Sequence, residues 1–220
     1  MTSQEIIRKF ELYVGDTTDL STQEEVDLLN KVYRGINNKR HWEYLKTTAT
    51  GTLQSLTGGI GHSLPSDFIS LYDNSLYTDN SISAQNNASP RVLWVTLPGA
   101  TDISPYQFIN YADRRQYRNQ NGSAYVDIKN SKFYITGTQT DLMPYELDYI
   151  FKPADLTISS AEADIVIPSQ FHDILFFGMC VDDMTIQLFD KARSYAATNQ
   201  AQYQSILDDL VFFNSQLQLN

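Results

Sequence analysis

Residues 145–188 read YELDYIFKPADLTISSAEADIVIPSQFHDILFFGMCVDDMTIQL, and this stretch decides the fold. From Tyr145 to Phe151 apolar side chains alternate with polar ones, a period of two that predicts a half-buried strand. Pro168 favours an extended residue before it and suits the first turn of a helix after it. From Ile174 to Leu188 apolar residues recur at steps of three and four, which predicts one long helix. The stretch therefore predicts a strand that leads into a central packing helix.

Helical patterns also stand at both ends of the chain. Thr2 with Glu5, and Ser21 with Glu24, fit the capping box, in which each side chain satisfies a backbone amide at a helix start. The helix after Ser21 is expected to continue toward Tyr44. A last stripe with the same spacing predicts a C-terminal helix; its residues are Tyr203, Ile206, Leu210, Phe213 and Leu217.

The residues between these helices favour strands. Strand patterns cover residues 47–56, 91–97, 124–129 and 133–138, the last two joined by a turn at Asn130-Ser131. Leu64-Pro-Ser-Asp-Phe68 predicts a turn or a short helix, and Ser104-Pro105 predicts a short helix, because proline is favoured at the first helical position. The expected fold is therefore α+β, a helical bundle formed by the N- and C-terminal helices with an inserted antiparallel β unit. The domains predicted are a discontinuous helical body, 1–45 with 168–220, and a β-rich unit, 46–167.

Composition and charge exclude several classes of function. The chain has 220 residues, 42% of them hydrophobic, and a net charge of −10, which argues against a general nucleic-acid binder because cations supply most of the affinity for phosphate. Cys180 is the only cysteine, so an intramolecular disulfide and a Cys-x-x-Cys site are impossible. No apolar run approaches the length of a membrane span or a signal peptide, so we expect a soluble protein of a reducing compartment.

Two basic clusters leave alternatives open. The segment between Lys31 and His41 could face DNA, although cations near a helix C-terminus also complement its dipole on a solvated face. Arg114, Arg115 and Arg118, interleaved with tyrosines, could bind nucleic acid or form a subunit interface, where Arg and Tyr are enriched.

The sequence predicts no catalytic, cofactor-binding or metal-binding residue. The three histidines, His41, His62 and His172, lack the spacing of a helical metal pair, and no Gly-x-Ser-x-Gly motif is present. Gly58-Gly-Ile-Gly-His-Ser63 lacks the Gly-Lys-Ser/Thr of a phosphate-binding loop and is better read as a turn. His172 is expected to form a local hydrogen bond, and the protein is not expected to be an enzyme.

Four segments occur in an order typical of a known family. They are Trp42-Glu-Tyr-Leu45, Leu64-Pro-Ser-Asp-Phe68, the strand ending at Lys152-Pro153, and Ile165-Val-Ile-Pro-Ser-Gln-Phe-His172 with Gly178. Together they resemble the head-to-tail adaptor (connector) proteins of tailed bacteriophages, in particular the tail tubular protein A type.

The resemblance implies a structural virion protein that forms a ring, expected to be dodecameric, between the portal and the tail. The implied partners are the portal protein, tail nozzle or tail fibre proteins, and neighbouring copies, while double-stranded DNA passes through the channel without specific binding. No cofactor and no membrane are implied. The implied location is the virion neck, after assembly in the host cytoplasm. Residues 168–220 contain 2 basic and 6 acidic groups, which would suit the lining of such a channel.

The predicted interface residues come from two segments. Apolar residues persist at the end of the last helix beyond what packing requires, so Phe212, Phe213, Leu217 and Leu219 are assigned to an interface. The arginines at 114, 115 and 118 are assigned to another. Two rival functions remain at this point: a soluble protein-binding module unrelated to phage tails, and a hydrolase, which would require a nucleophile and base.

Overall fold

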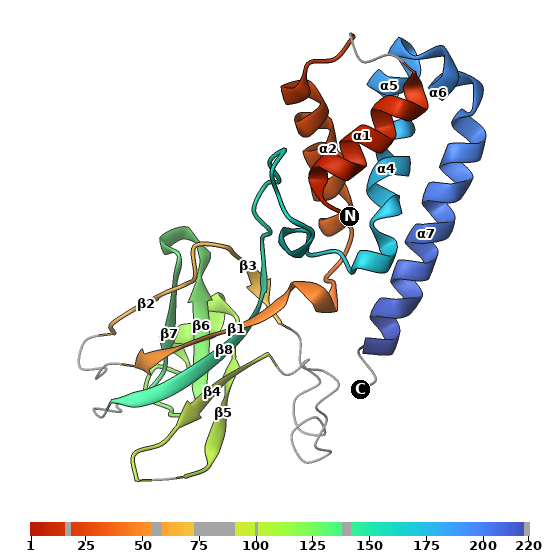
Figure 1. The fold of residues 1–220 in the computed structure, drawn as a ribbon. Helices are drawn as coiled ribbons and strands as arrows, with labels where there is room; N and C mark the ends of the chain where they lie inside the picture. The colour runs from red at the N-terminus through yellow and green to blue at the C-terminus, as the bar shows by residue number, and fades with distance from the viewer. Residues whose placement is uncertain (16–18, 54–58, 73–90, 100, 138–141, 218–220) are drawn as a thin grey trace. The chain divides into compact units, whose positions relative to one another are not determined.

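The computed structural model describes residues 1–15, 19–53, 59–72, 91–99, 101–137 and 142–217 (Figure 1). The chain forms two compact units. The helical unit contains Met1–Leu45 and Pro153–Asn220, and the β unit contains Lys46–Lys152.

The helical unit begins with two capped helices, α1 (Ser3–Val14) and α2 (Thr22–Asn37). Both predicted capping boxes are confirmed, because Thr2 and Ser21 each accept a backbone amide hydrogen bond while Glu5 and Glu24 return one. The second helix ends at Asn37 and not near Tyr44; a short 3-10 turn, η1 (Glu43–Leu45), follows it. Trp42 is fully buried beside this turn, and its indole Nε1 donates to the carbonyl of Ile36 at 2.9 Å.

The returning chain forms α4 (Asp173–Cys180), α5 (Asp183–Leu188), α6 (Asp190–Ser194) and α7 (Ala196–Leu217), after the 3-10 turns η4 (Glu162–Asp164) and η5 (Ser169–Phe171). The single long helix predicted up to residue 188 is therefore wrong. Val181 and Asp182 leave the helical conformation, and the Asp182 carboxylate caps α5 by accepting from the amide of Met184. Asp182 also pairs with Lys31 of α2 at 2.5 Å, a contact with a residue distant in sequence.

Helix α4 is the central element of the helical unit, in contact with α1, α2 and α7. Its side chains Ile174, Leu175 and Met179 are fully buried. A Cβ atom at Gly178 would overlap Cγ1 of Val32 in α2 and lie 3.3 Å from the Tyr203 ring in α7. Glycine at this position therefore permits the close approach of three helices.

The β unit is a mixed sheet. Its strands are β1 (Lys46–Leu53), β2 (His62–Ser63), β3 (Phe68–Leu71), β4 (Val92–Thr96), β5 (Ile103–Phe108), β6 (Ser123–Asp127), β7 (Lys132–Ile135) and β8 (Met143–Phe151). They follow the order β1-β8-β4-β5-β6-β7-β2, and β3 pairs with β8. Strands β5 and β6 run parallel, and the remaining pairs are antiparallel.

Within the described residues, the eight strands of the β unit form a nearly closed barrel and the helical unit has six α-helices, so the predicted helical bundle with an inserted antiparallel β unit is wrong. The main cause lies at Pro105, where the sequence predicted a helix and the structure has the middle of β5. Strand β5 pairs with β6 only at Gln107 and Phe108, so Pro105 lies beside an unpaired edge on that side, where proline is tolerated. The sequence patterns also did not predict the short strands β2 and β3.

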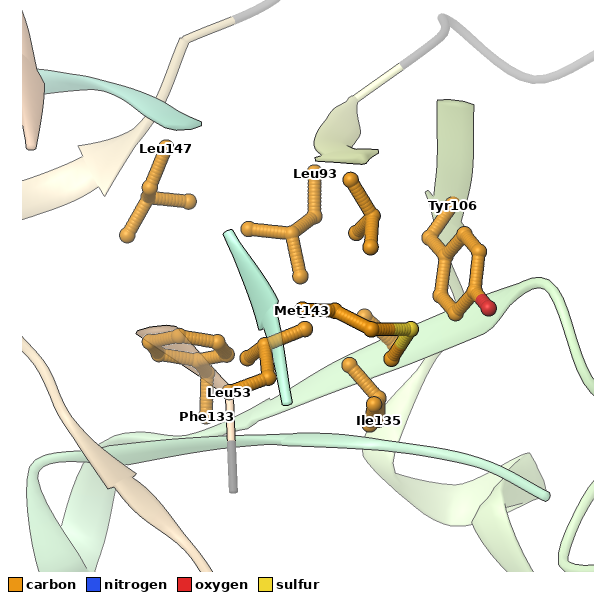
Figure 2. Packing of buried hydrophobic residues seen from close by; sticks show 9 residues of the cluster. Leu53, Leu93, Tyr106, Phe133, Ile135, Met143 and Leu147 are labelled. Carbon is orange, nitrogen blue, oxygen red and sulfur yellow. The ribbon is translucent and has the colours of Figure 1, made fainter. Parts of the chain in front are cut away.

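The interior of the β unit is a single apolar cluster contributed by six strands (Figure 2). Leu147, in the middle of β8, is fully buried, as the alternation from Tyr145 to Phe151 predicted. The other members are Leu53, Leu93, Val95, Tyr106, Ala124, Phe133, Ile135 and Met143. This core holds the outward-facing side chains of β6 and β7 in fixed positions.

Candidate functional site

His172 and Cys180 are buried side chains of the helical unit, and His62 packs on Phe133 in the β unit. His172 is buried, and its ring Nε2 lies 2.7 Å from the carbonyl oxygen of Ile167, which confirms the predicted local hydrogen bond. Burial lowers the pKa of His172 and of His62. Burial also raises the pKa of the Cys180 thiol to about 12. Over the described ranges, no group of three or more His, Cys, Asp or Glu residues could hold a metal ion.

Six side chains of the β unit form what we call the Arg–Tyr surface: Tyr111, Arg114, Arg115, Arg118, Tyr125 and Tyr134. The 3-10 turn η2 (Tyr111–Arg115) packs against β6 and carries Arg114 and Arg115, and Arg118 lies in the loop that follows it. The guanidinium of Arg114 lies 3.8 Å from the Tyr111 ring centre and donates from Nη1 to the Tyr111 carbonyl at 2.6 Å. Arg115 and Arg118 are exposed.

Tyr125 and Tyr134 are the part of this surface that the sequence analysis missed. They face each other across the β6–β7 pair, and their rings stack with centres 5.0 Å apart and planes 10° apart. The Tyr111 ring meets Tyr125 edge-on at 5.9 Å. Burial raises the pKa of Tyr125, while the nearby Arg114 acts in the opposite direction. The turn predicted at Asn130-Ser131 would place Thr136 opposite Tyr125, whereas the two strands are joined through Ile128–Asn130 and Ser131, so the sequence pattern did not predict this pair.

Hydrogen bonds to the end of β7 hold the loop that follows η2. The amide of Gly137 donates to the carbonyl of Arg118 at 3.0 Å, and the Thr136 hydroxyl donates to the carbonyl of Gln120 at 2.5 Å. Gly137 has φ +100°, and a Cβ there would overlap the side chain of Asn121. These hydrogen bonds therefore hold the loop that carries Arg118 against the end of β7.

The C-terminal helix α7 exposes the apolar side chain of Phe212 to solvent. Phe212 is 66% exposed and Leu217 is 40% exposed, whereas Phe213 packs on Phe171 with ring centres 5.4 Å apart. The buried Asn214 accepts from the backbone amide of Glu43 at 2.6 Å and so anchors the helix to η1. Of the four residues predicted for this interface, Phe212 and Leu217 are exposed. Phe213 packs on Phe171, and Leu219 lies outside the described residues.

Charge is divided unequally between the units. The helical unit contains 8 basic and 17 acidic residues, a net charge of −9, and the β unit contains 8 basic and 9 acidic residues, a net charge of −1. Helix α7 contains no lysine or arginine. Almost all of the net negative charge thus belongs to the helical unit.

The helical unit also has a depression of about 240 Å³ between α2 and α5, which we call the acidic depression. It is lined by Glu24, Asp27, Leu28, Lys31, Asp182 and Met184. Its only cation, Lys31, is paired with Asp182 at 2.5 Å, so the net charge of its lining is negative; Glu24 accepts hydrogen bonds from Ser21 and Asp27 accepts one from Gln23. Leu28 and Met184 give it an apolar part.

These features describe a protein built around contact surfaces, and the family comparison agrees with that class. A family model described as SU10 adaptor protein matches residues 1–219, and the chain belongs to this family. It is therefore a bacteriophage adaptor, a structural component of the virion, which confirms the sequence-based prediction at that level. A search among curated proteins finds no match. None of the described helices has the length and hydropathy needed to cross a membrane.

Proposed function

We propose that this adaptor joins the head of the virion to its tail, as a ring of copies, expected to be twelve, between the portal protein and the tail nozzle or fibres. The observation that supports this most directly is the match to an adaptor family over residues 1–219. We retain the tail tubular protein A type as the proposed subtype.

The surfaces of the helical unit support a role at the portal. Phe212 stands exposed on a helix whose other side is anchored through Asn214, so it offers an apolar contact on a rigid element. We assign Phe212 and Leu217 to contacts with the portal or a neighbouring copy. The β unit is assigned to the tail side.

The charge of the helical unit supports passage of DNA without retention. Lysine and arginine supply most of the non-specific affinity for the phosphate backbone, and α7 has neither. Its exposed face carries Asp208 and Asp209 among uncharged polar residues. We assign this face to the channel, where it would repel DNA weakly and bind none of it.

Electron microscopy of the protein mixed with the portal protein of the same virus tests the proposal. We expect a ring of adaptor copies stacked on the portal ring. A protein that leaves the portal unoccupied at micromolar concentration of both would contradict the proposed function.

A further inference from the structure

We propose that the Arg–Tyr surface of one copy binds the acidic depression on the helical unit of a neighbouring copy. The inference rests on the proposed function, because it states how adjacent copies meet in the ring. It assigns a surface, a partner and a polarity to that contact.

The Arg–Tyr surface is suited to carboxylates and not to nucleic-acid bases. Binding of single strands relies on bases stacking on free aromatic faces. Here Tyr125 and Tyr134 stack on each other at 5.0 Å, and Arg114 covers a face of Tyr111 at 3.8 Å. The groups left to a partner include the exposed guanidinium groups of Arg115 and Arg118, which match carboxylate oxygens in geometry and charge.

The surface is also held ready for a partner. Its turn is fixed to β6 by the Tyr111–Tyr125 contact, and its loop is fixed to the end of β7 by the amide of Gly137. A backbone that is already ordered loses less conformational entropy on binding. Arginine and tyrosine on a rigid frame are the residues that most often dominate the binding energy of protein interfaces.

The matching surface lies on the same chain, in the other unit. The helical unit has a net charge of −9, and the acidic depression exposes the carboxylates of Glu24 and Asp27 beside the apolar Leu28 and Met184. Lys31 does not oppose an incoming cation strongly, because Asp182 already neutralises it. An arginine head could meet the rim carboxylates while its aliphatic stem lies on the apolar side chains.

Pairing two different surfaces gives the contact a direction. A head-to-tail contact of this kind repeats from copy to copy and closes into a ring when the rotation per copy allows it. A symmetric contact, in which one surface meets itself, would stop at a dimer. The proposed pairing is thus consistent with a ring and with charge complementarity at once.

Charge reversal tests the pairing. We expect R115E/R118E and D27K/M184K each to reduce the number of copies bound per portal ring, measured by mass photometry, by at least tenfold at ionic strengths near 0.1 M. R8E on α1 and D19K before α2 change the charge of exposed residues outside both surfaces and should leave this number unchanged. Circular dichroism of each variant must match that of the wild type.

Cross-linking gives the second test and does not depend on how strongly a substitution weakens assembly. Cys180 is the only cysteine and is buried, so R115C and D27C each add one reactive thiol. With a short bis-maleimide on the portal, we expect a cross-linked pair only when R115C and D27C copies are mixed. Cross-links formed equally by either variant alone would overturn the direction of the contact.

These experiments distinguish a failure of the proposed pairing from a failure of the proposed head-to-tail function. If wild-type protein forms a ring on the portal and R115E/R118E forms the same ring, the inference is wrong and the proposed function stands. If wild-type protein forms no ring on the portal, both are wrong.

Discussion

The two units of this adaptor differ in how they use charge. The helical unit concentrates a net charge of −9 on a body whose helices pack tightly around α4, while the β unit is nearly neutral and gathers its arginines beside stacked tyrosines. The first arrangement repels polyanions, and the second attracts carboxylates. Under the two proposals above, the same chain presents one surface that lets DNA pass and another that binds a neighbouring copy.

The largest expected effect comes from Asn30, which holds the returning chain against α2. Its buried side chain accepts from the amide of Leu156 at 2.7 Å and donates to the Leu156 carbonyl at 2.8 Å. Asn30→Ala leaves two buried backbone groups without partners, each worth about 1–3 kcal/mol, so we expect the helical unit to lose about 4 kcal/mol of unfolding free energy.

The two tryptophans allow that loss to be assigned to one unit. Trp42 lies in the helical unit and Trp94 in the β unit. In a W94F background, urea unfolding followed by tryptophan fluorescence reports on the helical unit alone. Gln23→Ala, at an exposed position of α2, is the control and should change little. A loss below about 1 kcal/mol for Asn30→Ala would contradict the account of this clamp.

The second effect tests the close packing around α4. Gly178→Leu places a side chain where even a Cβ overlaps Val32, and overpacking of this kind costs about 1–3 kcal/mol. Gly35→Ala is the matched control, because Gly35 lies in α2 with no atom within 4 Å of its added Cβ. We expect Gly35→Ala to stabilise the helical unit by about 0.5–1 kcal/mol in the same fluorescence assay.

The third effect concerns how the buried acid Glu25 lowers the unfolding free energy of the helical unit at high pH. Burial, with a contribution from Glu11, raises the pKa of Glu25 to about 7. An acid whose folded pKa lies above its unfolded value of 4.5 binds protons more tightly when folded, so its contribution to stability is lost as pH rises from 4.5 through 7.

Glu25→Gln should therefore stabilise the helical unit at pH 8 relative to wild type, by about 2–3 kcal/mol, and should make no such difference at pH 4. Urea unfolding at both pH values measures this. Glu5→Gln would not serve as a control, because Glu5 returns a capping bond; Gln4→Ala, exposed on α1, does. Equal stabilisation by Glu25→Gln at both pH values would show that charge is not the cause.

The smallest effect concerns the exposed phenylalanine of α7. Phe212→Asp should leave the unfolding free energy within about 0.5 kcal/mol of wild type, because surface substitutions rarely do more. It should weaken binding to the portal by about tenfold, which corresponds to 1.4 kcal/mol. Titration calorimetry with the isolated portal measures this, and Gln4→Asp at an exposed position of α1 is the control. Unchanged affinity would remove Phe212 from the interface.

The two units also differ in how much of their structure the sequence predicts. The capping boxes at Thr2 and Ser21 are local, because every partner lies within three residues, and both predictions hold. Strand β5 depends on partners outside its own segment, namely β4 and the parallel β6, so the local signal at Pro105 favoured the wrong element. The break after Cys180 combines a local feature, the Asp182 side chain that caps α5, with an ion pair to Lys31, about 150 residues earlier in the chain.

The Arg–Tyr surface shows the same limit for a functional site. The arginines at 114, 115 and 118 were identified from their density in the sequence. Their neighbours Tyr125 and Tyr134 follow from the register of β6 with β7, which a turn signal indicates but does not fix. The acidic depression is lined by residues of both α2 and α5, so the sequence of either segment alone could not predict it.

Cryo-electron microscopy of the intact virion tests the central claim most directly. For the proposed head-to-tail adaptor, we expect a ring of copies at the neck, in contact with the portal on one side and tail proteins on the other, with α7 along the channel. Density for this chain at any other place in the particle, or single copies at the neck without contact between them, would contradict it.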